Sequence, residues 1–302
     1  MHTRPTTPNR AGTTRTIVIT ATVALAALVS TWAQAADNAD ALASAIGGSN
    51  RSNAHTQRDQ FRHPEQTLRF FGVRPDMTVV EVLPGGGWYT EILAPYLHDK
   101  GHLIEATYPE NTANPFLRRM AKQYSEKLEA NPDLYGRVTL QAFAPPDYIV
   151  LGPPHSADRI LTFRNMHDLV YANPHGEVTE TVMDRFFRAA YLALKPRGVL
   201  GVVAHRANPD ASVSKSFKQG RLPESFVIRM AERAGFRLQA ESEINANPKD
   251  PRDVPVWNLP PTLNAPENQR SKYAAIGESD RMTLKFVKPG EGDGGHMDNA
   301  SE

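Results

Sequence analysis

The chain of 302 residues contains no cysteine, and this absence excludes several kinds of chemistry. Disulfide bonds, thiolate metal sites and cysteine nucleophiles all need a sulfhydryl group. A lipoprotein is disfavoured for the same reason, because no cysteine can carry the lipid. The chain also lacks an excess of charge of either sign, with a formal net charge of +1 at pH 7. Such a balance gives no support to binding of nucleic acids or anionic membranes.

The N-terminal region has no apolar run long enough for a membrane-spanning helix, which needs about 20 residues. Its apolar stretch, residues 16–30, follows a basic segment without acidic residues and precedes the small-x-small sequence Ala33-Gln34-Ala35. This order predicts a Sec-type signal peptide over residues 1–35, cleaved near Ala35. We therefore expect a protein of the periplasm or a secreted protein, with no stable membrane anchor and a formal charge of −2 after cleavage.

The remaining residues divide by composition into three parts. Residues 36–60 are rich in Ala, Asn, Ser, Asp and Gln and predict a flexible leader with room for one helix. Residues 61–289 are long enough for one α/β domain with a substantial core. Residues 290–302 are rich in Gly, Asp and Asn and predict a disordered tail.

Within the domain, apolar runs alternate with amphipathic segments. The expected strands are residues 77–83, 102–107, 137–142, 158–163, 198–204, 236–242 and 281–287. The expected helices are residues 64–71, 88–97, 114–129, 178–193 and 223–234. Such alternation is typical of an α/β fold with a Rossmann-like, doubly wound, mostly parallel sheet covered by helices on both faces. Ligands bind such sheets at the carboxyl ends of the strands, near the point where strand order reverses.

A glycine turn, Pro84-Gly85-Gly86-Gly87, joins the first expected strand to the next helix. Glycines let the backbone approach a ligand closely, and the helix that follows presents unpaired N–H groups. The turn therefore predicts a nucleotide-like ligand. A dinucleotide site of the form G-x-G-x-x-G would need a third glycine, but Thr90 stands at that position. An NAD-dependent oxidoreductase is accordingly the weaker alternative.

The pattern instead resembles the first motif of class I S-adenosylmethionine-dependent methyltransferases, in which an acidic residue precedes a glycine-rich loop. Glu81 stands at the acidic position, Gly85 and Gly87 at the last two glycine positions, and Leu83 at the first. The segments 194–203 and 231–236 resemble the joints that lead into the fifth and sixth strands of that family. Four further segments are together similar to a group of exported, predicted methyltransferases of bacteria, namely residues 84–93, 162–167, 204–206 and 241–248.

The resemblance implies a seven-stranded sheet with an antiparallel last strand near residues 281–287. It also implies S-adenosylmethionine as cofactor and a small, unidentified acceptor. Glu81 would face the methionine ammonium or hold the loop. Family members usually end the second strand with an acidic residue that binds both ribose hydroxyls. Thr107 occupies that place, and Glu105, two residues earlier on the same strand face, can substitute only if the strand ends early. A nucleoside with a different ribose contact stays open.

The segment after the fourth expected strand carries the candidate catalytic residues. The resemblance places substrate and methyl-transfer residues here, where the chain has Arg164, Asn165, His167 and Asp168. Methyl transfer needs alignment of the nucleophile and, where the nucleophile loses a proton, a base. His167 suits that base, and Asn165 could orient the nucleophile or the cofactor. In the alternative interpretation, His167 caps a helix or pairs with Asp168 in a packing network.

His205 and Arg206 follow the fifth expected strand and should reach the same rim as His167. With Arg164 they are candidates for substrate binding, because an arginine can grip a carboxylate or phosphate, although a surface ion pair is its commoner fate. A metal site with Glu81 and His63 is a further alternative. The spacings H-x-H, H-x-x-x-H and H-E-x-x-H are absent among these candidates, so the sequence gives it no local support.

The polar, proline-rich stretch at residues 241–263 predicts a long loop of the kind that often forms a lid. Trp257 within it either covers the cleft and contacts the substrate or packs on the core. A non-catalytic periplasmic binding protein on the same fold is the competing functional class, favoured by Leu83 and Thr107.

Overall fold

The computed structural model describes residues 1–2, 37–172, 175, 177–290 and 292. The chain separates into two compact units, Met1–Ala41 and Leu42–Glu302. In the first unit, residues 37–41 are helical. The expected signal peptide beyond residue 2, and most of the expected tail, lie outside the described residues. In the part of the chain that the structure describes, no helix is long and apolar enough to cross a membrane.

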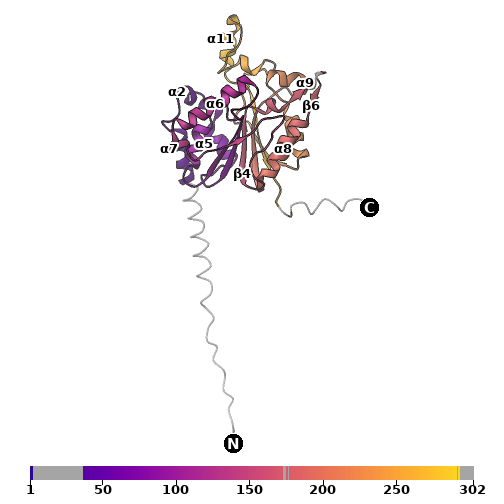
Figure 1. The fold of residues 1–302 in the computed structure, drawn as a ribbon. Coiled ribbons are helices and arrows are strands. Elements are labelled where there is room, and N and C mark those ends of the chain that lie inside the picture. Colours follow the sequence, from indigo (N-terminus) through magenta and orange to yellow (C-terminus); the bar gives the residue numbers. More distant parts are fainter. Residues whose placement is uncertain (3–36, 173–174, 176, 291, 293–302) are drawn as a thin grey trace, which may run out of the picture. The chain divides into compact units, whose positions relative to one another are not determined.

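A seven-stranded sheet forms the centre of the second unit (Figure 1). Its order is β3-β2-β1-β4-β7-β9-β8. The strands are β1 (Thr78–Val82), β2 (His102–Thr107), β3 (Thr139–Ala142), β4 (Ala157–Phe163), β7 (Leu194–His205), β8 (Arg237–Ser242) and β9 (Arg281–Val287). Only β9 runs antiparallel to its neighbours. The predicted fold class and the antiparallel last strand are confirmed, and strand order reverses between β1 and β4.

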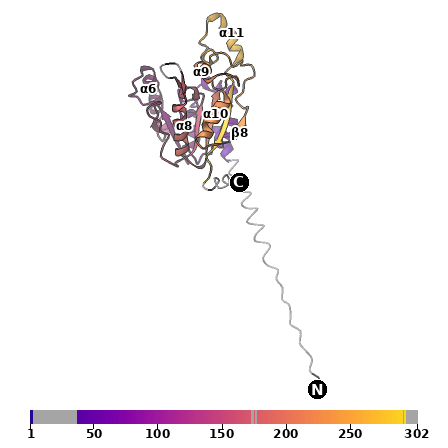
Figure 2. The same ribbon diagram turned by 90° about the vertical axis from the view of Figure 1, so that its right-hand side faces the viewer.

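Helices cover both faces of this sheet. Those longer than one turn are α4 (Pro64–Phe70), α5 (Thr90–Leu97), α6 (Pro115–Glu129), α8 (Thr181–Ala193), α10 (Glu224–Arg233) and α11 (Glu267–Ile276). The one-turn helices are α2 (Asn53–Thr56), α3 (Asp59–Arg62), α7 (Pro132–Tyr135) and α9 (Val213–Ser216), with 3₁₀ turns η1 (Met166–Leu169), η2 (Phe217–Gln219) and η3 (Val256–Asn258). A two-stranded hairpin joins β5 (Tyr171–Ala172) to β6 (Val178–Thr179). In Figure 2, α8 and α10 lie in front of the sheet, and α11 projects from the second unit.

The first strand shows why the central strands are apolar on both sides. Val80 and Val82 pack with α8 and α10 in one core cluster, whereas Val79 packs with α4 and α5 in a second cluster. Successive side chains of a strand point to opposite faces, so a strand covered on both faces needs an unbroken apolar run. Glu81 interrupts that run on the face of Val79, which makes it an unusual residue for a core position.

Residues 42–60 are more ordered than the expected flexible leader. Leu42 and Ala45 are buried in the second core cluster, and the side chain of the buried Arg51 pairs with Asp59 at 2.7 Å. The indole N–H of Trp88 donates to the carbonyl of His55 at 3.0 Å. Composition gives little sign of this order, because few apolar residues take part and the other contacts are an ion pair and a bond to a backbone carbonyl.

Candidate functional site

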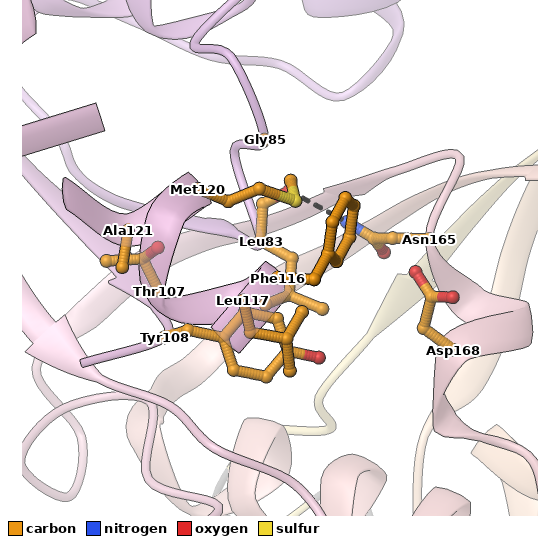
Figure 3. A pocket seen from close by; sticks show the side chains of 10 residues that line it. All are labelled: Leu83, Gly85, Thr107, Tyr108, Phe116, Leu117, Met120, Ala121, Asn165 and Asp168. Carbon is orange, nitrogen blue, oxygen red and sulfur yellow. Dashed lines mark hydrogen bonds between the residues drawn. The ribbon is translucent and has the colours of Figure 1, made fainter. Parts of the chain in front are cut away.

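Two adjoining cavities lie at the carboxyl ends of β1, β2, β4 and β7. The smaller, here called the apolar compartment, has a volume of about 310 Å³ (Figure 3). The larger, called the polar compartment, has a volume of about 510 Å³. Both are lined by Leu83, Gly85, Met120 and Asp168, so the two compartments share a wall. The site therefore lies where the strand order predicts a ligand, beside the topological switch point.

The apolar compartment lies between β2 and α6. Phe116, Leu117 and Met120 of α6 line one side, and Thr107 and Tyr108 at the end of β2 line another (Figure 3). Phe116 is 56% exposed although it is a large apolar residue. A flat, apolar ring placed in this compartment would cover surface that is otherwise in contact with water.

The turn between β1 and α5 alternates between left-handed and ordinary backbone. The φ angles of Leu83, Gly85 and Gly87 are 51°, 61° and 77°. Gly87 also packs closely, because a Cβ atom there would lie 3.0 Å from Tyr124 and 3.1 Å from the amine of Lys127. Glycine is thus required at position 87 by both conformation and contact.

Gly85 and Gly86 differ from Gly87 in what surrounds them. Both line the polar compartment, and a Cβ atom added to either would meet no atom within 4 Å. Empty space therefore lies directly against the backbone of this turn. The conformation of Gly86 is an ordinary one, so neither packing nor strain requires glycine there, and a side chain at this position would enter the cavity.

Glu81 lies beneath the turn and lines the polar compartment, although it is only 3% exposed. Its Oε2 accepts a hydrogen bond from the Thr90 hydroxyl at 3.1 Å. Its neighbour in the sheet register is Glu105 of β2. Burial raises the pKa of Glu81 to about 7, and burial together with the charge of Glu81 raises the pKa of Glu105 well above its ordinary value. Glu81 is therefore close to its titration midpoint at neutral pH, and the neutral form of Glu105 is favoured by its surroundings.

The second strand does not end early enough for Glu105 to reach a cofactor. β2 continues to Thr107, which pairs with Ala142 of β3. Glu105 is completely buried and lines neither compartment, whereas Thr107 lines the apolar compartment. The prediction that Glu105 contacts the cofactor is therefore corrected, and a hydroxyl rather than a carboxylate stands at the end of this strand.

Asn165 connects the end of β4 to the end of β1. Its amide donates to the carbonyl of Val82 at 2.7 Å and to that of Leu83 at 3.2 Å, the second bond being drawn in Figure 3. Its Oδ1 accepts from the hydroxyl of Thr162. These bonds show that Asn165 positions the turn. Its role in orienting the nucleophile or the cofactor stays a prediction.

His167 and His205 are brought together as the sequence predicts. Both line the polar compartment, and their ring centroids are 5.7 Å apart. His205 contacts the hydroxyl of Ser279, and Nε2 of His167 lies 3.4 Å from a carboxylate oxygen of Asp168. Burial lowers the pKa of His167 and lowers that of His205 further, so both imidazoles are neutral at pH 7. The pairing of His167 with Asp168 agrees with the network alternative as well as with a base held in place.

The structure separates the remaining candidates. Arg164 lines the polar compartment with a left-handed φ of 69°, and Trp257 lines it while 38% exposed. Arg206 lines neither compartment. Its guanidinium pairs with Glu243 at 2.8 Å and Glu224 at 3.1 Å. The prediction of a substrate contact by Arg206 is corrected to the alternative ion pair.

Two functional candidates that the sequence did not indicate lie at the border between the expected leader, which includes Arg58, and the expected domain, which includes Arg62. Arg62 is the last residue of α3 and Arg58 is the residue before its first. Both line the polar compartment, as does His55. Their spacing of four residues places both on one helix face, which was the only available signal in the sequence. Both pair with the buried Glu278, at 2.8 Å and 3.4 Å.

The metal alternative gains no support in the part of the chain that the structure describes. No group of three or more His, Asp or Glu side chains there is arranged to hold a metal ion. His63 lines neither compartment, and burial lowers its pKa.

No family model matches the sequence, and no curated protein matches it. Solved structures do resemble the chain. The [4+2]-cyclase SpnF is 15% identical, with a TM-score of 0.51 over 83% of this chain and 92% of that chain. Phosphoethanolamine N-methyltransferase 2 of Haemonchus contortus, in complex with S-adenosyl-L-methionine, is 16% identical, with a TM-score of 0.50 over 82% of this chain and 56% of that chain. An Aquifex aeolicus SAM-dependent methyltransferase is 18% identical, with a TM-score of 0.48 over 76% and 92%.

At these identities the resemblance shows the fold alone. Together with the strand order, it identifies the Rossmann-like fold of class I methyltransferases. One of these neighbours is called a cyclase and another a methyltransferase, so the reaction has to be argued from the residues of the site.

Proposed function

We propose that this chain is an S-adenosylmethionine-dependent methyltransferase that acts on a small acceptor. The observation that carries the proposal is the empty space against the backbone of Gly85 and Gly86, in a cavity joined to an apolar compartment. A ligand with a flat apolar base and a polar, amino-acid-like end suits this pair of compartments. Their combined size lies within the range of small-molecule sites.

The residues present fit such a cofactor in three places. Leu117 and Met120 would hold the base, and Thr107 would meet the ribose. Gly85 and Gly86 would lie against the methionine portion, and Glu81 would face its ammonium. When bound, the cofactor supplies a sulfonium-activated methyl group. A positive ammonium near Glu81 would favour the ionised carboxylate and lower its pKa from about 7.

His167 is the base in this proposal. Because burial keeps its imidazole neutral at pH 7, one ring nitrogen is free to accept a proton from the acceptor as the nucleophile attacks. Asp168, 3.4 Å away, holds the ring in place and stabilises the imidazolium that forms. Asn165 contributes indirectly, because its hydrogen bonds hold the turn on which the cofactor would lie.

Isothermal titration of the purified protein with S-adenosylmethionine, S-adenosylhomocysteine and NAD tests the proposal. We expect the first two to bind and NAD not to bind, because Thr90 stands where a dinucleotide site needs glycine and its hydroxyl is engaged with Glu81. If neither sulfur compound binds at millimolar concentration, the cofactor assignment is wrong.

A non-catalytic binding protein on the same fold is the second candidate, favoured by Thr107 at the end of β2. A ribose held without a carboxylate suits a nucleoside ligand as well as the full cofactor. Comparing adenosine with S-adenosylhomocysteine separates the two candidates. Equal affinities would favour nucleoside binding, whereas a clear preference for S-adenosylhomocysteine would show that the polar compartment contributes.

We also propose export by the Sec route with cleavage near Ala35, supported by the sequence of residues 1–35. Mass spectrometry of the protein recovered from a bacterial periplasm should give a chain that begins at Ala36. Recovery of the uncleaved chain from the cytoplasm would contradict the proposal.

A further inference from the structure

We propose that the polar compartment contains an anion-binding subsite, formed by Arg58, Arg62 and Arg164, that holds a carboxylate or phosphate group of the acceptor. The inference rests on the proposed function in one respect, namely that the bound anion belongs to the methyl acceptor. The anion site itself follows from the residues that line the cavity.

The three guanidinium groups come from two distant parts of the chain. Arg58 and Arg62 are four residues apart at α3, and Arg164 follows β4. All three line the polar compartment. Burial lowers the pKa of Arg164, and the nearby charges of Arg62 and Arg58 lower it further.

The positive charge of this cluster exceeds the negative charge that is paired with it. Glu278 pairs with Arg58 at 2.8 Å, with Arg62 at 3.4 Å and with Arg281 at 3.0 Å. The charges of Arg164, Arg62, Arg281 and Arg58 hold the pKa of Glu278 down to about 2, against the effect of burial. One carboxylate thus faces four arginines, three of them in direct ion pairs. Arginine cannot discharge itself by losing a proton, so the excess charge calls for a further anion.

The two acidic residues that line the compartment, Glu81 and Asp168, do not provide that anion. Glu81 titrates near pH 7 and accepts from Thr90. The side chain of Asp168 is 51% exposed and lies beside His167. Neither forms an ion pair with the three arginines among the described residues.

Two guanidinium nitrogens in the cluster are shielded from water and lack a hydrogen-bond partner. They are Nε of Arg164 and Nη2 of Arg58, and both belong to residues that line the cavity. A buried donor without an acceptor costs about 1–3 kcal/mol, more when it is charged. A carboxylate or phosphate accepts from several guanidinium N–H groups at once, which makes it the ligand that this arrangement fits.

Charge favours the acceptor over the cofactor as the source of the anion. S-adenosylmethionine has one carboxylate, but its ammonium and sulfonium leave it with a net positive charge. It would therefore add to the excess in the compartment. Arg164 lies near His205, whose pKa it lowers, and three residues before His167. An anion bound at Arg164 would bring the acceptor beside the proposed base.

The experiment titrates the purified protein with inorganic phosphate and, separately, with acetate at constant ionic strength. Both are measured with and without saturating S-adenosylhomocysteine, by calorimetry and by the shift of the thermal midpoint. Arg164→Met removes the charge. Arg164→Lys keeps the charge but loses the paired N–H groups with which a guanidinium binds an anion in bidentate fashion. Arg69→Met is the matched control, because it removes an equal charge from an exposed pair with Glu65.

We expect wild type and Arg69→Met to bind at least one anion equally well, and the tighter of the two identifies the phosphate or carboxylate class. Arg164→Met should weaken that binding about tenfold or more, with Arg164→Lys intermediate and the affinity for S-adenosylhomocysteine unchanged. If Arg164→Met does not fold, Arg58→Met takes its place with the same expected loss.

Three other results are decisive. If S-adenosylhomocysteine binds to wild type but neither anion does, the subsite is absent. If Arg164→Met weakens S-adenosylhomocysteine but not 5′-methylthioadenosine, which lacks the carboxylate, the arginines hold the cofactor and the proposal is wrong. If an anion binds through Arg164 but S-adenosylhomocysteine does not bind, the anion site stands and the proposed function fails.

Discussion

Two groups of buried ionisable residues lie at the wall of the polar compartment or behind it, and burial affects them in opposite ways. On the acidic side, Glu81 and Glu105 lie next to each other on β1 and β2, and burial raises the pKa of both carboxyl groups. On the basic side, Arg58, Arg62 and Arg164 keep their charges and share Glu278. Carboxyl groups can be neutral near pH 7, but guanidinium groups cannot. The acidic side is therefore adjustable by pH, whereas the basic side depends on partners.

The largest effect is expected when His167, the proposed base near Arg164, is replaced. His167→Ala should lower kcat by about 10²–10⁴-fold on an identified acceptor, with little change in the affinity for S-adenosylhomocysteine, because proton transfer concerns the acceptor only. Single-turnover kinetics and calorimetry measure the two quantities. Full activity of the variant would contradict the assignment of His167 as base, and insoluble protein would favour the packing network with Asp168.

The next effect concerns the carboxylate that the arginines share. Glu278→Gln should lower the free energy of unfolding by about 3–5 kcal/mol, because it leaves buried guanidinium groups without their counter-charge. Urea unfolding at pH 7 measures this change. Glu65→Gln removes an exposed carboxylate paired with Arg69 and should cost at most about 0.5 kcal/mol. Equal costs for the two variants would mean that the arginine cluster does not depend on Glu278.

The same residue predicts the acid sensitivity of the wild type. The pKa of Glu278 is lowered to about 2 in the folded chain, below the ordinary value of 4.5. Its contribution to stability is therefore fully present above about pH 4.5 and is lost as the pH falls toward 2. In Glu278→Gln, that part of the acid dependence should be missing.

For Glu81, on the acidic side, we expect the opposite dependence of stability on pH. Because the pKa of Glu81 is raised to about 7, its ionisation costs folding free energy as the pH rises from about 4.5 to 7. Glu81→Gln should remove this decline and raise the free energy of unfolding at pH 8 by about 1–3 kcal/mol. It should also weaken the binding of S-adenosylmethionine, because the carboxylate is lost. Unfolding curves at pH 5 and pH 8 test this. A variant less stable than wild type at pH 8 would show that Glu81 is needed as a charge.

The smallest effect concerns the turn that borders both sides. Gly86→Ala adds one Cβ atom in open space at a position with ordinary backbone conformation, so it should fold normally. If the cofactor lies on this backbone, affinity for S-adenosylhomocysteine should fall about tenfold. Gly47→Ala adds a Cβ atom that makes only an ordinary contact and should leave affinity unchanged. Equal affinities in both variants would place the ligand elsewhere.

The fold could be predicted because the central strands are buried on both faces and are therefore apolar runs. The elements that were missed give no such signal. Helix α11 has only Tyr273 buried, and the hairpin of β5 and β6 has two residues in each strand. The helices of residues 42–62 are held by polar contacts such as the pair of Arg51 with Asp59, which composition does not reveal.

The site could be predicted only as far as strand ends define it. The carboxyl ends of β1 and β4 led to the glycine turn and His167, and that of β7 led to His205. The sequence does not tell which way a residue beyond a strand end faces. His205 lines the cavity, whereas Arg206, the next residue, turns to Glu243. Arg58 and Arg62 were missed because their partner Glu278 lies more than 200 residues later.

Lys127 links helix α6 to the glycine turn through hydrogen bonds of its amine. It lies on α6, the helix whose Met120 lines both compartments. Its amine donates to the carbonyl of Gly86 at 2.8 Å and to the carboxylate of Glu91 at 2.7 Å. A movement of α6 away from the sheet would pull on the glycine turn or break these bonds. The position of α6 against the apolar compartment and the position of the glycine turn beside the polar compartment are therefore coupled through a single amine.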